Sequence, residues 1–508
     1  MNTNSIYKNS VFYVSILITG VFIIWGIFFT ENLTKVTTAF FNGTINHFGW
    51  VYLSSALFFV LFAFYLLFSK YGRIRLGKES DRPEFKTGSW LAMLFGAGMG
   101  IGIVYYAVAE PVLHYTSPPI GKGYTDTAAA EAMKYTFFHW GLQPWGIYAV
   151  IGLAFAFFQF NRGLPASVSS VFYPVLKDKI YGPIGKTIDI LAVVATVFGI
   201  ATSLGLGTMQ ITAGLNHLFN VPDTLTIQII VIAVATVLFL ISITTGLKRG
   251  IKYLSNTAII LSFTMMALIM IVGPTSSIFK VLFDTTGSYF NDWLDMSLSL
   301  QPFGEGEWIN GWTLFYWAWW IAWAPFVGMF IARISKGRTI SQFITGVLIV
   351  PALGTFVWLS VFGGSALHII HNLGNPELAT QITSNLSLSI FSFFDYLPLS
   401  SLLSILGFTV VAVYYITVAD TATYVLGMLC EGGKLNPSNK IKITWGVIQS
   451  LVAVVLLLAG GLEVLQKVSI AAAFPFAIVM LLMCWSLIRE LRNEVDINKK
   501  SVKEEKAS

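Results

Sequence analysis

Charged residues are scarce in this sequence. Lysine, arginine, aspartate and glutamate make up 11% of its 508 residues, whereas soluble domains carry about 25%. Hydrophobic residues reach 55%, and the mean hydropathy is +0.72. This composition excludes a string of soluble domains. It predicts an all-α polytopic membrane protein with short tails, because a helix satisfies its own backbone hydrogen bonds in lipid.

Cysteines and catalytic motifs are also few. The two cysteines, Cys430 and Cys484, show neither a metal-binding spacing nor a disulfide framework. Six histidines are scattered along the chain, and no nucleophile elbow, HExxH sequence or phosphate-cradling loop occurs. A polytopic membrane enzyme would need a polar catalytic cluster, and a receptor would need a soluble output domain. We therefore expect no enzymatic activity, no catalytic residue and no cofactor.

Long apolar segments recur along the whole chain. A membrane-spanning helix needs about 20 apolar residues, and twelve segments fit this length. The first lacks a small-residue cleavage site and is expected to be retained as a helix. The predicted spans are residues 11–30, 50–69, 89–115, 134–159, 187–217, 225–245, 252–274, 309–334, 340–366, 399–429, 442–460 and 464–488.

Lysine and arginine gather in alternate loops between these spans. The 69–88 loop contains six of them, whereas the opposite set of loops is poor in them and the 276–308 segment is acidic. Under the positive-inside rule this pattern places both termini in the cytoplasm, as expected for a multi-pass protein of the plasma membrane. The net charge of +6 and the pI near 9.0 follow from this topology, so no binding to nucleic acid is expected.

Two segments outside the spans have distinctive patterns. Residues 276–308 mix aromatic residues and leucine with acids, which predicts amphipathic helices on the outer surface. The tail from Arg489 mixes both signs of charge. It is either a solvated tail or a contact with the inner leaflet or a regulatory surface.

Tryptophan is concentrated in one apolar segment. Trp317, Trp319, Trp320 and Trp323 fall within seven positions. Each indole has an N–H that needs a partner, so lipid-facing surfaces seldom hold so many. At about 100° per residue, two ring-bearing faces of the helix converge on Trp323. Two interpretations are open: a tightly packed helix contact or interfacial belt, and a cage for a quaternary ammonium ligand.

Four glycines alternate in the third predicted span, at Gly96, Gly98, Gly100 and Gly102. Each disfavours a helix by about 1 kcal/mol relative to alanine. A nucleotide-binding loop is excluded, since no strand–turn–helix context surrounds them. Close helix packing is one explanation; a helix broken at the membrane midplane, whose free backbone groups bind a carboxylate and a cation, is the better one. Glu110, in the same span, is expected near the outer end of its helix.

A second aromatic cluster lies in the fourth predicted span. Trp140, Trp145 and Tyr148 occupy an arc of about 140° on an ideal helix, and Pro144 removes a backbone hydrogen bond between them. A bend at Pro144 would aim the three rings into one pocket, and simple packing is the alternative. His139 is expected to be a satisfied interior histidine rather than a ligand.

Together the three motifs resemble the betaine/carnitine/choline transporter family. The glycine segment with Ala109-Glu110-Pro111, the 139–148 segment and the tryptophan stretch continuing to Thr339 all match, and the likeness covers roughly residues 10–490. The resemblance implies twelve helices in two inverted five-helix repeats, the LeuT-like fold of sodium-coupled amino-acid transporters, and a homotrimer. Each repeat would begin with a breakable helix, glycine-rich in one and tryptophan-rich with Pro325 in the other.

This fold divides the chain into five parts. They are an N-terminal tail with two peripheral helices, a first repeat, an extracellular amphipathic segment, a second repeat and a cytoplasmic charged tail. The expected bounds are residues 1–88, 89–275, 276–308, 309–488 and 489–508.

The resemblance also implies which residues meet the substrate. The aromatic box around its ammonium group would consist of Trp140, Trp145, Tyr148 and Trp320. Its carboxylate would meet Trp323 and the backbone around Met99, which includes Gly98 and Gly100. Trp319 would lie on the path of the substrate, just inside this site.

Sodium is the coupling ion that the resemblance implies. One site would use backbone oxygens of Gly96 and Met99 together with Thr417. A second site would use Thr196 and the ring of Phe326. No metal other than sodium is expected.

Three positions bear on this assignment. Val418 stands where sodium-coupled members usually have a serine, and Ile200 where a second hydroxyl is expected one turn after Thr196. Gly102 stands where proton-coupled choline carriers tend to have an aspartate. The resemblance implies an importer of a trimethylammonium compatible solute by sodium symport with alternating access. Glycine betaine is the first expectation for its substrate, choline the second and carnitine the third.

Overall fold

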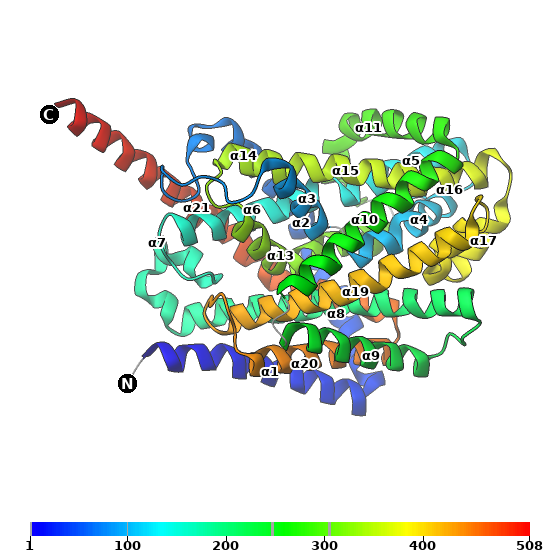
Figure 1. Ribbon diagram of the computed structural model, residues 1–508, viewed down its shortest axis with the longest axis horizontal. Coiled ribbons are helices and arrows are strands. Elements are labelled where there is room, and N and C mark those ends of the chain that lie inside the picture. The colour runs from blue at the N-terminus through cyan, green and yellow to red at the C-terminus, as the bar shows by residue number, and fades with distance from the viewer. Residues whose placement is uncertain (1–2, 99, 245–247, 303–305, 508) are drawn as a thin grey trace.

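The computed structural model describes residues 3–98, 100–244, 248–302 and 306–507 (Figure 1). Within these ranges the chain forms helices joined by turns, with one isolated bridge between Arg75 and Thr339. The helices up to the middle of the chain are α1 (Thr3–Phe28), α2 (Thr30–Phe68), α3 (Thr87–Gly98), α4 (Ile101–Thr116), α5 (Asp126–Trp140), α6 (Leu142–Phe160), α7 (Tyr173–Leu176), α8 (Pro183–Phe219), α9 (Leu225–Thr244) and α10 (Lys248–Val272).

The remaining helices include several short ones joined by π-helical turns. They are α11 (Thr275–Leu298), α12 (Glu307–Ile309), α13 (Phe315–Ile334), α14 (Ile340–Ile344), α15 (Val350–Leu359), α16 (Ser365–Leu367), α17 (Pro376–Ser384), α18 (Ser389–Phe394), α19 (Ser400–Cys430), α20 (Asn439–Leu458) and α21 (Leu462–Ala507). The all-α class predicted from the sequence is confirmed.

The number of possible membrane spans agrees with the sequence. The described residues contain ten helical stretches long and apolar enough to cross a membrane, or up to twelve if each of two bent pairs is one span. One pair joins Thr87–Gly96 to Ile101–Thr116 at 65°, and the other joins Asn256–Val272 to Thr275–Leu298 at 110°. The inverted repeats and the division into five parts stay predictions.

Three details differ from or refine the sequence expectations. The fourth span begins at Asp126 and is interrupted at Gly141, between α5 and α6. The helix expected in the 276–308 segment is present as α11. The second expected break is wrong: α13 runs unbroken through Pro325. Prolines are tolerated inside such helices when packed neighbours and local adjustments satisfy the freed backbone groups.

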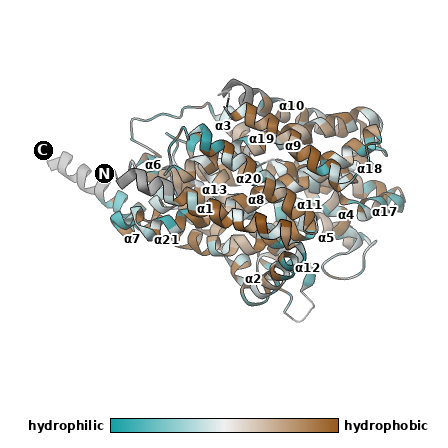
Figure 2. Ribbon diagram, turned by 90° about the horizontal axis from the view of Figure 1, so that it is seen from below, coloured by the Kyte–Doolittle hydropathy of each residue, from teal (hydrophilic) through white to brown (hydrophobic). Residues whose placement is uncertain are grey.

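Helix α13 lies in the core of the bundle, near the centre of Figure 1. Every residue in 313–329 is buried, and the helix packs on α6, α8 and α21. In an 18-residue apolar window of Glu307–Ile334, 94% of the residues are buried. In the corresponding window of α9, 28% are buried. Figure 2 shows α1 and α9 covered with apolar residues (brown), as suits lipid-facing helices. The tryptophans of α13 therefore contact protein, which excludes an interfacial belt.

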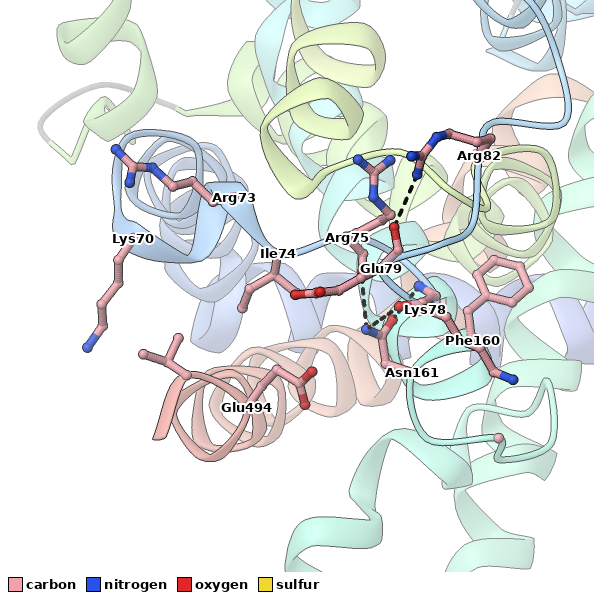
Figure 3. Close-up of a pocket in the computed structure, with 13 residues that line it drawn as sticks. Lys70, Arg73, Ile74, Arg75, Lys78, Glu79, Arg82, Phe160, Asn161 and Glu494 are labelled. Atoms are coloured by element: carbon pink, nitrogen blue, oxygen red, sulfur yellow. Dashed lines mark hydrogen bonds between the residues drawn. The ribbon is translucent and has the colours of Figure 1, made fainter. Parts of the chain in front are cut away.

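The charged tail continues α21 and contacts the end of α6. Arg162 Nε lies 2.6 Å from Glu490 Oε1, and Arg162 Nη1 lies 2.6 Å from Glu494 Oε2. Beside this contact is an open cavity lined by the basic 69–88 loop (Figure 3). The first turns of the tail therefore contact the protein itself, which neither interpretation of the tail included, and both interpretations stay predictions for the rest of it.

We predict that Arg162→Ala releases this end of α21. The variant leaves two glutamates without their shared cation, so trypsin should cleave faster at Arg489 and Arg492. Arg333→Ala is the control, because Arg333 pairs with Glu84 at 3.0 Å while both side chains are about half exposed, and such pairs contribute little. Equal cleavage rates in both variants would contradict the prediction. Limited proteolysis followed by mass spectrometry measures them.

Candidate functional site

The predicted break in the glycine segment is present. Helix α3 ends at Gly98 and α4 begins at Ile101, while Met99 lies outside the described residues. Gly100 has an extended backbone with φ −134° and ψ −158°. A Cβ placed on Gly100 would lie 3.6 Å from Val418 Cγ2 and 3.7 Å from Trp323 Cη2. The break therefore faces α19 and the tryptophan stretch of α13.

A second interruption occurs at Gly141 rather than as a bend at Pro144. Gly141 has φ −91° and ψ −131°, and a Cβ there would lie 2.6 Å from the Phe137 carbonyl oxygen. Pro144 has no N–H to offer the carbonyl of Trp140, four residues earlier. Thr355 offers a donor, because its Oγ1 lies 2.9 Å from the Trp140 carbonyl oxygen and shares its proton between that oxygen and the Ala352 carbonyl oxygen at 2.7 Å. The carbonyl freed by the proline is thus satisfied from α15.

The neighbouring carbonyl of His139 binds α13. Trp320 Nε1 donates to it at 3.1 Å. This bond fixes the Trp320 ring against the interruption between α5 and α6. The Trp140 and Trp320 ring centroids are 5.0 Å apart with an interplanar angle of 78°. The two aromatic clusters predicted from the sequence therefore meet.

The other two rings of the predicted box pack beside Trp320. Its centroid is 5.9 Å from that of Tyr148, and Tyr148 is 5.9 Å from Trp145. The Tyr148 hydroxyl is buried and has no hydrogen-bond partner among the described residues. A buried hydroxyl without a partner is costly, so a ligand that accepts its hydrogen bond would remove that cost.

A small cavity lies between the glycine break and the tryptophans. It is lined by Gly100, Gly102, Ile103, Trp140, Trp319, Trp320 and Trp323. Its volume is about 10 Å³, enough for about one water molecule. Trp145 and Tyr148 lie behind this lining rather than in it. The rings are in contact, so the cavity as it stands is too small for a ligand larger than a water molecule.

Indole N–H groups on the far side of the cavity are bound to α8. Trp323 Nε1 donates to the Gly199 carbonyl at 2.9 Å, and Trp319 Nε1 lies 3.4 Å from the same oxygen. The predicted contact between Trp323 and a carboxylate therefore requires this bond to be exchanged. The backbone at the Gly100 break has no such competitor among the hydrogen bonds of the described residues.

The residues predicted for sodium lie around the same region. Val418, next to Thr417, faces the break at Gly100. Thr417 Oγ1 donates to the Val413 carbonyl and Thr196 Oγ1 donates to the Ala192 carbonyl, each at 2.7 Å. A hydroxyl that donates its proton in this way keeps its lone pairs for a cation.

The remaining two sodium candidates are placed by their neighbours. The Phe326 ring is 5.4 Å from that of Trp323. Gly96 packs against α10, where a Cβ would lie 2.8 Å from Ile259 Cδ1. Among the described residues, no hydrogen bond joins Thr196 to another helix near Phe326, so both sodium sites stay predictions.

Sequence reasoning missed the role of Glu110. Its carboxylate is fully buried, and Oε2 accepts hydrogen bonds from Trp140 Nε1 at 2.7 Å and Tyr316 OH at 2.5 Å. Oε1 lies 2.7 Å from His139 Nδ1 and 3.2 Å from His114 Nε2. His139 is a satisfied interior histidine, as expected. The signal was available, because an acid inside a span is costly and marks a functional position.

Comparison with known proteins gives consistent results. The family model for betaine/carnitine/choline family transporters matches residues 10–496. The glycine betaine transporter OpuD of Bacillus subtilis is 48% identical over 98% of this chain and 97% of its own length. A probable glycine betaine transporter of Desulfitobacterium hafniense is 42% identical over 96% of this chain and 98% of its own. The osmo-dependent choline transporter BetT2 of Acinetobacter baylyi is 38% identical over 95% of this chain and 71% of its own.

We predict that Gly102→Ala disrupts the cavity while Gly100→Ala leaves it intact. A Cβ at Gly102 would lie 2.4 Å from Trp319 Cη2, whereas the nearest atoms to one at Gly100 are at ordinary contact distance. Trp319 cannot yield easily, because it is stacked on Phe315 and Trp320. Overpacking should cost about 1–3 kcal/mol. Thermal unfolding of the purified protein measures this loss, and equal melting temperatures for the two variants would contradict it.

Proposed function

Because this chain belongs to the betaine/carnitine/choline transporter family, we propose that it imports a trimethylammonium compatible solute, with glycine betaine as the preferred substrate. Family membership makes it a multi-pass membrane transporter rather than an enzyme. The observation that carries the proposal is the meeting of Trp140 and Trp320 beside a broken helix. The names of the two glycine betaine transporters support the same substrate for this chain.

The ammonium end of glycine betaine suits the aromatic rings. Its methylated nitrogen has no N–H, so it gains most from the negative faces of aromatic rings, each contributing about 0.5–2 kcal/mol when desolvated. In the proposed open state, Trp140 and Trp320 part and the methyl groups enter between them. Tyr148, which packs beside Trp320, and Trp145, which packs beside Tyr148, complete the box. This explains why four aromatic residues from two distant segments converge here.

The carboxylate end suits the break between α3 and α4. The first N–H groups of a helix have no intrahelical partners and carry the positive end of its dipole. Helix α4 begins at Ile101, at the edge of the cavity. A carboxylate that meets the backbone from Gly98 to Ile101 would be stabilised there, with Trp323 as a second donor once it releases Gly199. Choline has no carboxylate for these donors, which favours betaine.

Sodium symport supplies the energy in this proposal. A net-neutral zwitterion gains nothing from the membrane potential, whereas each sodium ion gains about 2.3 kcal/mol per 100 mV in addition to its concentration gradient. The first site would use the carbonyls of Gly96 and Met99 with Thr417. The second would use Thr196 with the ring of Phe326. Val418 leaves the first site one hydroxyl short of the usual pattern, so the backbone carbonyls of Gly96 and Met99 would have to supply a larger share of the sodium coordination.

The transport cycle would follow from the LeuT-like arrangement. Two inverted five-helix repeats would rock about the central cage and expose it first outside and then inside, with both termini in the cytoplasm of the cell and the protein in the plasma membrane. A homotrimer is part of the same proposal. Choline is the second candidate substrate, because an aromatic box accepts any trimethylammonium group and one relative is named a choline transporter. Carnitine is the third.

We predict that an inward sodium gradient drives uptake of radiolabelled glycine betaine into proteoliposomes. Replacing sodium by potassium on both sides should reduce uptake to the level of protein-free vesicles. Equal uptake of glycine betaine with and without sodium would contradict the coupling. Uptake of choline without any uptake of betaine would contradict the substrate assignment.

We also predict that Trp320→Leu weakens betaine binding at least about tenfold, since a leucine has no π face for the ammonium group. Trp358→Leu is the matched control, because Trp358 of α15 is also buried but stacks on Phe362 and does not line the cavity. Isothermal titration calorimetry compares the two variants. The box is misplaced if Trp320→Leu binds betaine as tightly as the unmodified protein does.

A further inference from the structure

The proposed function leaves one group of the site without a task, the buried carboxylate of Glu110. Glu110, His114 and His139 are each completely buried, and one ligand atom from each lies within 4.8 Å of the others. Among the described residues, the ion-pair contacts of Glu110 are with these two histidines alone. A carboxylate so deep in the protein needs either a proton, a metal ion or several hydrogen-bond donors.

One arrangement of the protons makes Glu110 an anion. An indole can only donate, so Trp140 Nε1 supplies a hydrogen to Glu110 Oε2, and Tyr316 OH supplies a second. Each neutral imidazole can supply one N–H to Oε1. His139 Nε2 then accepts from Thr313 Oγ1, which lies 2.9 Å away.

The other nitrogen of His114 completes this pattern. His114 Nδ1 is buried and has no hydrogen-bond partner among the described residues. A bare lone pair costs less in such a place than an N–H, and far less than an imidazolium. A carboxylate anion with four donors and two neutral histidines satisfies all of these contacts. A protonated Glu110 that donates to His139 Nδ1, with His139 Nε2 donating to Thr313 Oγ1, satisfies them as well. We take the anionic arrangement, in which the cluster carries a net charge of −1, and the charge-dependent binding test below decides between the two.

A metal ion bound at this cluster would have to displace the hydrogen bonds of Glu110. Two histidines and a glutamate are ligands that zinc accepts. However, in the anionic arrangement both of the short His–Glu contacts need a proton on the nitrogen that would face the metal. The second carboxylate oxygen is already committed to Trp140 and Tyr316.

The charge sits directly behind the cage. Trp140 lines the cavity, and its N–H edge points at Glu110. Tyr316 packs against both cage rings, with its centroid 5.5 Å from Trp140 and 6.1 Å from Trp320. The backbone carbonyl of His139, whose ring contacts Glu110, holds the Trp320 indole. Glu110 thus positions both rings that receive the ammonium group.

We propose that Glu110 is the buried counter-ion of the ammonium group: its carboxylate, acting through Trp140, makes the cage select a positively charged headgroup over a neutral one of the same shape. The inference rests on the proposed function and assigns a specificity-determining role within that site. A negative charge at the N–H edge of an indole increases the electron density on its face, which strengthens the cation–π interaction. The carboxylate also attracts the cation directly through a medium of low polarity.

The ligand pair that isolates this effect is choline and its carbon isostere dimethylbutanol, in which carbon replaces the nitrogen. Both have the same shape, and only choline is charged. We expect the unmodified protein to bind choline at least about tenfold more tightly than dimethylbutanol, because two charges separated by several ångströms attract strongly inside a protein. Quenching of tryptophan fluorescence in the purified full-length protein measures both, with glycine betaine as the reference.

Glu110→Gln removes the charge but keeps the shape and the capacity to accept from Trp140. We expect it to reduce the preference for choline over dimethylbutanol about tenfold, while Glu110→Asp keeps most of it. Asp189→Asn is the matched control. Asp189 is a buried carboxylate that accepts from the Ser169 backbone and hydroxyl, about 15 Å along α8 from Gly199. The Asp189→Asn variant should prefer choline over dimethylbutanol as strongly as the unmodified protein does.

The outcomes separate the two proposals. If the unmodified protein binds neither glycine betaine nor choline, the proposed function itself fails. If it binds them and Glu110→Gln weakens choline and dimethylbutanol equally, Glu110 has only a structural role and the inference is overturned. If Glu110→Gln does not fold, equal affinities of the unmodified protein for the two isosteres overturn it instead. Stoichiometric metal in the purified protein, lost in Glu110→Gln, would also overturn it.

Discussion

Two backbone carbonyls, those of His139 and Trp140, tie the candidate site together, because a carbonyl in an apolar interior must find a donor. Gly141 interrupts the helix and Pro144 withholds an N–H, so both carbonyls turn to other helices. Trp320 of α13 and Thr355 of α15 supply the donors. The cost of breaking a helix is thereby offset by cross-links between segments far apart in the sequence. Those cross-links position the two rings of the cage.

Glycine supplies the complementary constraint. The tryptophans can lie close to α4 and α8 only because Gly102 and Gly199 have no side chain where the indoles pack. The alternating glycines of the third span therefore fit both explanations that the sequence left open, close helix packing and a broken helix. They break the helix at Gly100, and at Gly102 they allow close packing. The break and the packing occur within one turn and belong to the same cavity.

Much of this arrangement could be predicted from the sequence, since apolar length, glycine spacing and the tryptophan cluster are local signals. The all-helical class, the break near Gly100 and the meeting of the two aromatic clusters were all within reach. The interruption at Gly141 was not. It depends on Thr355 and on Tyr289, whose hydroxyl accepts from the Leu142 N–H at 3.2 Å, and these contacts form only in the folded chain. The unbroken course of α13 through Pro325 depends on packed neighbours in the same way. Glu110 was underestimated because its four donors come from three separate helices.

The proposed mechanism requires that a trimethylammonium group enters between Trp140 and Trp320 once the cage opens. The most direct test is an experimental structure of the full-length protein with saturating sodium and glycine betaine. We expect parted Trp140 and Trp320 rings with the methylated nitrogen between them and the carboxylate at the Gly100 break. Betaine bound elsewhere in the protein, with the two rings still in contact as they are here, would contradict it.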